Sequence, residues 1–309
     1  MNILVALGGN AILRENEKGT FEEQNANIAT TAKHLLKLIK KGHNIVVTHG
    51  NGPQVGDILL RYELSRKVLP TMPLHVCGGE SQGMMGYMIG LALSNAMASA
   101  GVKKDVACVL TRTVVDPSDP RFKKPSKPIG PFYSKANADK LAEAFGWSLV
   151  REGKKYRRVV ASPTPVEIVE FDTIRRLMEE GKIVVCAGGG GVPVVRNGSH
   201  MEGVDAVIDK DRASSLLASK LHVDRLMILT DVSHVFIDYG KREQRPLLHV
   251  NARDCKNYLS EGQFEEGTMM PKVQAAVDFV RTTHGKAVIA DLEDAESALA
   301  GKAGTTILP

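Results

Sequence analysis

The chain has 309 residues, 43% of them hydrophobic and 24% charged, which is ordinary for a globular protein of one large α/β domain or two lobes. The net charge of +5 comes mainly from dispersed lysines and arginines, which favours small anionic ligands over nucleic acid. Four cysteines without a CxxC pair indicate neither a disulfide framework nor a zinc site. The sequence predicts no signal peptide and no membrane-spanning run, so we expect a cytoplasmic protein.

Strand and helix signals alternate along the first part of the chain, which indicates an α/β protein. Hydrophobic runs predict strands, and apolar residues at helical spacing predict the helices between them. The strands are expected at 2–7, 44–48 and 106–111. The first helix is marked by an apolar face between Ile28 and Ile39 and is expected to stop at Gly42, and the next two helices are expected at about 55–66 and 81–100.

The amino-acid composition changes at residue 116, where five prolines occur within sixteen residues. No regular core element tolerates that density of proline. The stretch 116–160 therefore predicts an inserted lid subdomain, with a short helix at 137–145.

Alternation resumes after the insertion and continues to the last residues. Helices are expected at 170–180, 211–221, 271–283 and 293–300, and strands at 182–187, 225–230, 286–290 and 305–308.

Three predicted strands end in glycine-rich segments. The segments are Gly8-Gly9-Asn10, Gly50-Asn51-Gly52 and 188–191. Ligands of open α/β sheets bind at the carboxyl ends of the strands, where glycine lets backbone N–H groups approach an anion. The same glycines could also form plain tight turns between strand and helix.

Three lysines have settings that suit phosphoryl transfer, which needs cations and N–H donors around the transferred oxygens. Lys127 lies between prolines in the insertion. Lys210 lies between Asp209 and Asp211 at a predicted helix start, and Lys272 lies near another. A lysine at a helix N-terminus opposes the helix dipole, and a bound anion would offset that conflict. The alternative is solvated helix-end lysines, which are common.

The motifs taken in order resemble the carbamate kinases of the amino-acid kinase superfamily, from residue 2 to the C-terminal 305–309. Most members of the superfamily carry a lysine just before the first glycine pair, where this chain has Ala6-Leu7. In carbamate kinases a lysine of the protruding subdomain takes that role, and Lys127 matches it. The motifs are Val5–Ala11, Thr48–Gly56, Lys127–Tyr133, Arg157–Pro163, Ala187–Pro193, Val207–Asp211, Leu229–Val232 and Pro271-Lys272.

This resemblance implies a three-layer αβα sandwich with a mainly parallel central sheet, two lobes and a small protruding subdomain. The lobe 1–205, with the lid 116–160, would bind carbamate or carbamoyl phosphate, and the lobe 206–309 would bind nucleotide. The reaction implied is reversible phosphoryl transfer between ATP and carbamate, as in arginine breakdown. Mg²⁺ would be held by the phosphates of ATP or ADP, without a committed protein ligand. A homodimer is also implied.

The resemblance assigns roles to individual residues. Lys127 and Lys210 would neutralise the phosphoryl oxygens, Lys272 would hold the terminal phosphates of the nucleotide, and Asp209 would orient the lysines. The small substrate would contact Gly8, Gly9, Asn10, Gly50, Asn51 and Gly52. The nucleotide would lie near Thr230, Asp231, Tyr239 and Met270, as well as Lys210 and Lys272.

Other interpretations remain open. The chain could be a related kinase with a different acceptor, or a non-catalytic nucleotide sensor, although a sensor would be expected to lose one of the lysines. A dinucleotide-dependent oxidoreductase is disfavoured because GxGxxG does not follow the first strand. We expect His49 to be structural and Cys77 to be a small loop residue. The methionines at 84–88 fit a core or a dimer interface.

Overall fold

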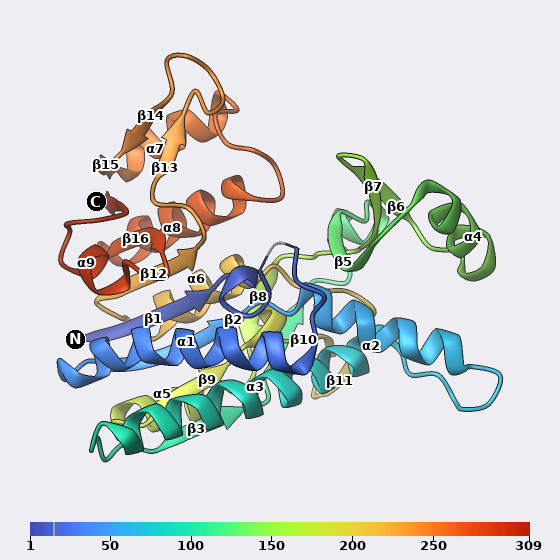
Figure 1. Ribbon diagram of the computed structural model, residues 1–309, viewed down its shortest axis with the longest axis horizontal. Helices are drawn as coiled ribbons and strands as arrows, with labels where there is room; N and C mark the ends of the chain where they lie inside the picture. The colour runs from blue at the N-terminus through green and yellow to red at the C-terminus, as the bar shows by residue number, and fades with distance from the viewer. Residues whose placement is uncertain (15) are drawn as a thin grey trace.

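A computed structural model describes residues 1–14 and 16–309. Its centre is an eight-stranded sheet, ordered β15-β17-β16-β12-β1-β2-β9-β3 (Figure 1). Neighbouring strands pair in parallel except β16 and β17, which are antiparallel. In chain order the strands are β1 (Asn2–Leu7), β2 (Asn44–His49), β3 (Val106–Val109), β9 (Ile183–Cys186), β12 (Arg225–Thr230), β15 (His249–Asn251), β16 (Lys286–Asp291) and β17 (Thr305–Leu308).

Helices cover both faces of this sheet, so the predicted three-layer sandwich is confirmed. Alternate residues of β1 point to opposite faces, so Leu4 and Ala6 belong to one core and Ile3, Val5 and Leu7 to the other. One layer holds α1 (Phe21–Lys40), α3 (Leu74–Ser99) and α9 (Ala295–Leu299). The other holds α5 (Phe171–Glu179), α6 (Lys210–Lys220), α7 (Ala252–Ser260) and α8 (Met269–Thr283).

Several helices begin earlier than the hydrophobic pattern predicts. Thr20 and Glu23 form a capping box that starts α1 at Phe21, seven residues before the first expected apolar position. Helix α3 begins directly after Pro73 and continues through Gly78 and Gly79, although two adjacent glycines would be expected to interrupt a helix. Cys77 therefore lies in a helix rather than in the expected loop.

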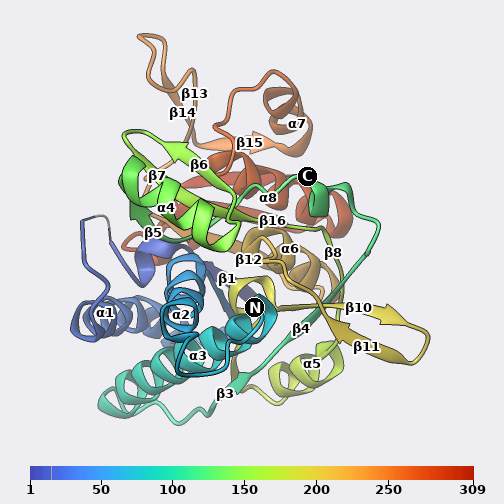
Figure 2. The same ribbon diagram turned by 90° about the vertical axis from the view of Figure 1, so that its right-hand side faces the viewer.

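The segment after residue 116 contains a separate three-stranded antiparallel sheet, ordered β5-β7-β6, with one helix beside it. We call this part, residues 127–160, the lid. It projects from the body beside α2 (Gly52–Ser65), as Figure 2 shows. Its elements are β5 (Lys127–Tyr133), α4 (Lys135–Phe145), β6 (Leu149–Glu152) and β7 (Lys155–Val160).

Two further features were not predicted. A four-stranded sheet, ordered β11-β10-β4-β8, lies beside the main one. A hairpin of β13 (Val235–Ile237) and β14 (Arg245–Leu247) forms a second projection, near α7 (Figure 1). The four-stranded sheet comprises β4 (Arg112–Val115), β8 (Pro165–Ile168), β10 (Val192–Asn197) and β11 (His200–Gly203). Among the described residues, no helix combines the length and the apolar character needed to span a bilayer.

Candidate functional site

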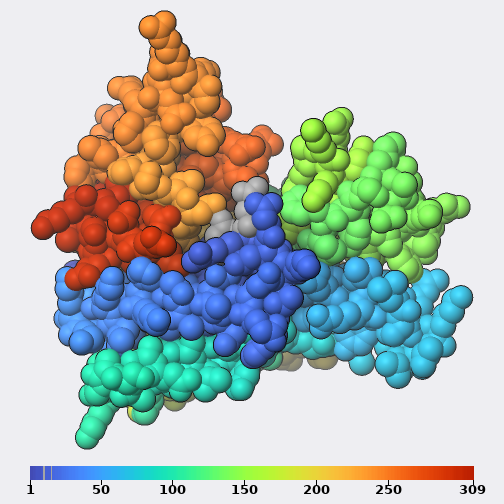
Figure 3. Space-filling view, viewed as in Figure 1, coloured from blue at the N-terminus to red at the C-terminus, as the bar shows by residue number. Residues whose placement is uncertain are grey.

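A cavity of about 610 Å³ opens where β1, β2 and β12 end. Figure 3 shows a hollow between the lid and the second projection, above the segment that follows β1. The lid base, the glycine segments and the first turns of α6 and α8 all line the cavity. These parts are distant in sequence, and the carboxyl ends of the parallel strands bring them together.

The first two glycine segments lie on the floor of the cavity. Gly8 donates its N–H to the Leu229 carbonyl, and a Cβ at Gly8 would lie 2.8 Å from that oxygen, so close packing of β1 on β12 requires glycine. Gly9 and Gly50 also line the cavity. Asn10 belongs to the short 3₁₀ helix Gly9–Ala11, and its side chain lies outside the described part of the chain.

Asn51 lines the cavity, and its buried side chain packs against the third glycine segment. Its amide donates to the Ser81 hydroxyl at 2.7 Å. A Cβ at Gly189 would lie 2.2 Å from that same amide, and Gly189 has a φ of +61°. The third glycine segment therefore positions Asn51, while the backbone of Gly50–Gly52 faces the cavity.

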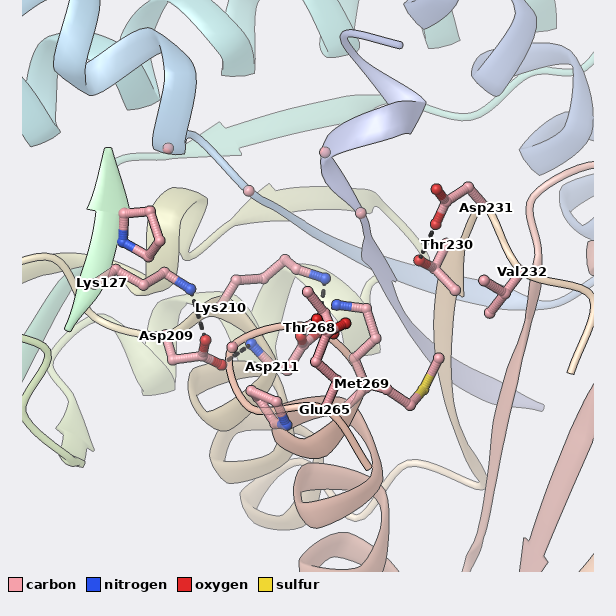
Figure 4. Close-up of a pocket in the computed structure, with 18 of the residues that line it drawn as sticks. Lys127, Asp209, Lys210, Asp211, Thr230, Asp231, Val232, Glu265, Thr268 and Met269 are labelled. Atoms are coloured by element: carbon pink, nitrogen blue, oxygen red, sulfur yellow. Dashed lines mark hydrogen bonds and ion pairs between the residues drawn. The ribbon is translucent and has the colours of Figure 1, made fainter. Parts of the chain in front are cut away.

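The three predicted lysines converge on two aspartates (Figure 4). The Lys127 amine, from β5 of the lid, donates to Asp209 Oδ2 at 2.7 Å. The Lys210 amine lies 2.6 Å from Asp211 Oδ1, and the Lys272 amine, from α8, lies 3.3 Å from Asp211 Oδ2. Three ammonium groups from separate segments thus share one wall of the cavity.

The start of α6 fixes both aspartates. Asp209 is the N-cap, and its Oδ1 accepts the backbone N–H of Asp211 and Arg212 at 2.9 and 3.2 Å. Its other oxygen is left for Lys127. Asp211 lies inside the first turn and is 3% exposed, so its carboxylate contacts the two remaining lysines from within the protein.

The charges in this cluster shift one another's pKa values. Burial alone would raise the pKa of both carboxyl groups, but the neighbouring ammonium groups outweigh it and hold both values below the usual range. Burial lowers the pKa of Lys210, which Asp211 only partly offsets. Burial also acts on Lys272, but the attraction of Asp211 and Asp209 prevails and raises its pKa.

The part of the cavity around the end of β12 includes the apolar side chains of Val232, Phe236 and Met269. Thr230, the last residue of β12, and Asp231 also line it, and the Thr230 hydroxyl donates to the Asp231 carboxylate at 3.0 Å. Tyr239, which is largely exposed, lies 6.1 Å from Phe236 between ring centres. Met270 packs on the core, whereas its neighbour Met269 lines the cavity.

Sequence reasoning missed two charged residues of this site. Asp211 was recognised only as a helix-start residue, although its position beside Lys210 is a signal that could have found it. Arg157 of β7 lines the cavity near Gly52. No local pattern distinguishes Arg157 from its neighbour Arg158, because only the fold of the lid turns one of them toward the cavity.

His49 and Cys77 are both buried, and neither belongs to the cluster of three lysines and two aspartates. The Nδ1 atom of His49 lies 2.9 Å from the Gly50 carbonyl, and the ring packs on Gly188. Burial lowers the pKa of His49 to about 4, so the ring is neutral at pH 7. Burial, together with the charge of Glu80, raises the pKa of Cys77 to about 11, so its thiol is unreactive near neutrality.

The comparisons with known proteins identify the class of this protein. The model of the amino acid kinase family matches residues 1–291, so the chain is a kinase. A carbamate kinase of Pyrococcus horikoshii is 45% identical, with 99% of both chains covered.

Two solved carbamate kinase structures from Giardia lamblia, one bound to citric acid and one to AMP-PNP, are each 42% identical to this chain. Their TM-scores are 0.96 and 0.91, and each match covers 99% of this chain and 98% of the other. The chain therefore belongs to the amino acid kinase family, within its carbamate kinases.

Proposed function

We propose that this protein catalyses reversible phosphoryl transfer between carbamoyl phosphate and ADP, yielding carbamate and ATP. The observation that carries the proposal is the convergence of Lys127, Lys210 and Lys272 around Asp209 and Asp211. Such an arrangement supplies fixed positive charge where a transferred phosphoryl group spreads its negative charge over three oxygens.

The chemistry needs no general base at the reacting oxygens. In the ATP-forming direction the bond between phosphorus and the carbamate oxygen breaks, and a bond from phosphorus to a β-phosphate oxygen of ADP forms. The carbamate leaves as an anion with the bonding electron pair, and the incoming ADP oxygen is already an anion. A neutral, buried His49 is consistent with this reaction because no proton has to be moved there.

Each charged residue has a place in this scheme. Lys127 and Lys210 neutralise the transferring oxygens, and Lys272 holds the terminal phosphates of the nucleotide near Asp231. Asp209 and Asp211 keep the ammonium groups in place before the ligand arrives, so little reorganisation is left for the reaction. The backbone N–H groups of Gly8–Gly9 and Gly50–Gly52 hold the small substrate.

Mg²⁺ is the metal that we expect with the nucleotide. Among residues 1–14 and 16–309 no cluster of three or more His, Cys, Asp or Glu side chains could hold a metal ion. In proteins Mg²⁺ is often bound by one or two carboxylates together with substrate phosphates and water, and the Asp231 carboxylate lines the cavity. The ion would offset the charge of the nucleotide phosphates.

We further propose a homodimer, a cytoplasmic location and a role in carbamoyl phosphate metabolism such as arginine breakdown. The methionines of α3 at 85 and 88 are buried in the core, so they are not a docking surface. Tyr87 and Leu91 on the same helix are exposed, as is Leu110 beside the edge strand β3. This apolar face supports the dimer proposal.

The test is a coupled assay of ATP formation from ADP and carbamoyl phosphate, run beside a panel of other acyl phosphates and acceptors. We expect turnover with carbamoyl phosphate above every other compound. A preference for another acceptor would contradict the assignment. Nucleotide binding without any turnover would make the protein a sensor.

A further inference from the structure

Arg157 differs from the three lysines of the cavity because it forms no close ion pair with a carboxylate of the described residues. Each of the three lysines lies within 3.3 Å of a carboxylate oxygen. Among the described residues, none places a carboxylate within 4.0 Å of Arg157, although Glu152 and Asp57 act on it from farther away. Burial lowers its pKa, yet a guanidinium remains charged at neutral pH.

The lid fixes the orientation of this guanidinium. The Nε–H group of Arg157 donates to the Gly130 carbonyl at 2.9 Å, and its Cζ atom lies 5.1 Å from the centre of the Phe132 ring. The stem is therefore anchored to β5 by one hydrogen bond and one ring contact. The two terminal nitrogens take part in neither bond and are left for another partner.

The guanidinium faces the N-terminus of α2. A Cβ built on Gly52 would lie 3.8 Å from Arg157 Nη2 and 3.4 Å from the Pro128 carbonyl. The first N–H groups of a helix have no partner within the helix, and those of Gly52 and Gln54 border the cavity here. Helix end and guanidinium thus present donors to the same volume.

This volume is part of the cavity that the lysine–aspartate cluster also lines, and the cluster includes the residues assigned to the phosphoryl group. What remains beside it is the acyl end of the substrate, a planar group. It has one free oxygen in carbamoyl phosphate, where the second oxygen bridges to phosphorus, and two free oxygens in carbamate. Arginine presents parallel N–H donors in a plane, which matches such a group better than the point charge of lysine does.

We propose that Arg157 binds the acyl oxygens of carbamoyl phosphate and carbamate against the N-terminus of α2, and so selects the acceptor. This inference rests on the proposed function. Arg157 stabilises the carbamate anion as it leaves, while the lysines act on the phosphoryl group. Because Arg157 belongs to the lid and Gly52 to the body, the substrate bridges the two parts.

The test compares Arg157→Gln and Arg157→Lys with wild type, and with Arg151→Gln as a matched control. Arg151 lies in the same lid sheet, and its Nε–H donates to the Gly153 carbonyl, away from the cavity. We measure kcat/KM for carbamoyl phosphate at saturating ADP, KM for ADP, and thermal unfolding.

We expect Arg157→Gln to lower kcat/KM for carbamoyl phosphate about 10- to 100-fold, the effect of one charge-assisted hydrogen bond. Arg157→Lys should recover part of the loss, and KM for ADP and the control should stay within about twofold. If Arg157→Gln fails to fold, the Arg157→Lys comparison carries the test, with an expected fall in kcat/KM at unchanged melting temperature.

Two results would overturn the inference. The first is kcat/KM for carbamoyl phosphate within twofold of wild type in both variants. The second is an equal rise in KM for ADP, which would mean that Arg157 acts only by holding the lid. Absence of turnover in the wild-type protein would instead refute the proposed function.

Discussion

The backbone of Gly56 in α2 packs directly on the backbone of Gly130 in β5. A Cβ on Gly56 would lie 2.1 Å from the Gly130 nitrogen and Cα, and Gly130 has a φ of +70°. This glycine pair seats the lid on the body three residues from Lys127. The position of the lid lysine therefore depends on the absence of a single methyl group.

Gly56→Ala should displace the lid. The overpacked contact should cost about 1–3 kcal/mol of stability. Turnover should also fall, because Lys127 can no longer reach Asp209 in the same geometry. The control is Gly78→Ala in α3, where a Cβ meets nothing within 4 Å. Unfolding curves and turnover measure both effects. Wild-type stability and turnover of Gly56→Ala would show that the backbone at Gly130 can move to accept the added methyl group.

Lys127→Ala should lower kcat about 100- to 1,000-fold, or 2–4 kcal/mol, because the lysine acts mainly on the transition state. Nucleotide affinity should be retained. Lys135→Ala serves as the control, since its amine pairs with Asp139 on the exposed side of the lid. Steady-state kinetics and ADP titration check both expectations. Near-normal turnover would remove Lys127 from the mechanism.

Asp211→Asn should reduce both turnover and stability. Losing this carboxylate leaves the buried Lys210 without its closest counter-charge, and breaking a buried pair costs about 3–5 kcal/mol. The exposed Asp278 on α8 provides a matched control as Asp278→Asn. Thermal unfolding and kcat are the measurements. A variant that unfolds normally and keeps full activity would show that Asp209 alone is a sufficient counter-charge for the lysines.

The buried His49 should make the protein less stable in mild acid. Its pKa is about 6.5 when unfolded and about 4 when folded, so below pH 6.5 the unfolded chain binds more protons. The contribution of the neutral His49 to the free energy of unfolding is complete above pH 6.5. It is lost as the pH falls toward 4, by about 3 kcal/mol in total.

Urea unfolding between pH 7 and 4.5 checks this slope. Relative to wild type, His49→Gln should show a flatter dependence over that range. Parallel profiles for wild type and His49→Gln would rule out a neutral histidine at this site.

The strands and helices of the three-layer sandwich were predicted from the sequence better than the segments that project from it. The strand expected at 44–48 and the helix expected at 81–100 both have a clear hydrophobic pattern. The strand was predicted to within one residue, whereas the helix ends as expected but begins seven residues earlier, at Leu74. The hairpin of β13 and β14 has only three residues in each strand, too few for an alternating pattern. α7 has a local signal, since Asn251 caps it by accepting from Asp254, and that signal was overlooked.

The candidate site was predictable where its residues stand in short motifs. Lys210 and its flanking aspartates are adjacent in sequence, so their proximity follows from the chain itself. The pairing of Lys127 with Asp209 joins residues 82 positions apart. Which of Asp209 and Asp211 faces the lid depends on the first turn of α6, because capping uses one oxygen of Asp209 and orients the other.

The lysine–aspartate cluster is nearly self-neutralised. Three ammonium groups against two carboxylates leave a single unit of positive charge within the cluster. A metaphosphate-like PO₃ group in flight carries one negative charge, so the surroundings balance it at the moment of transfer.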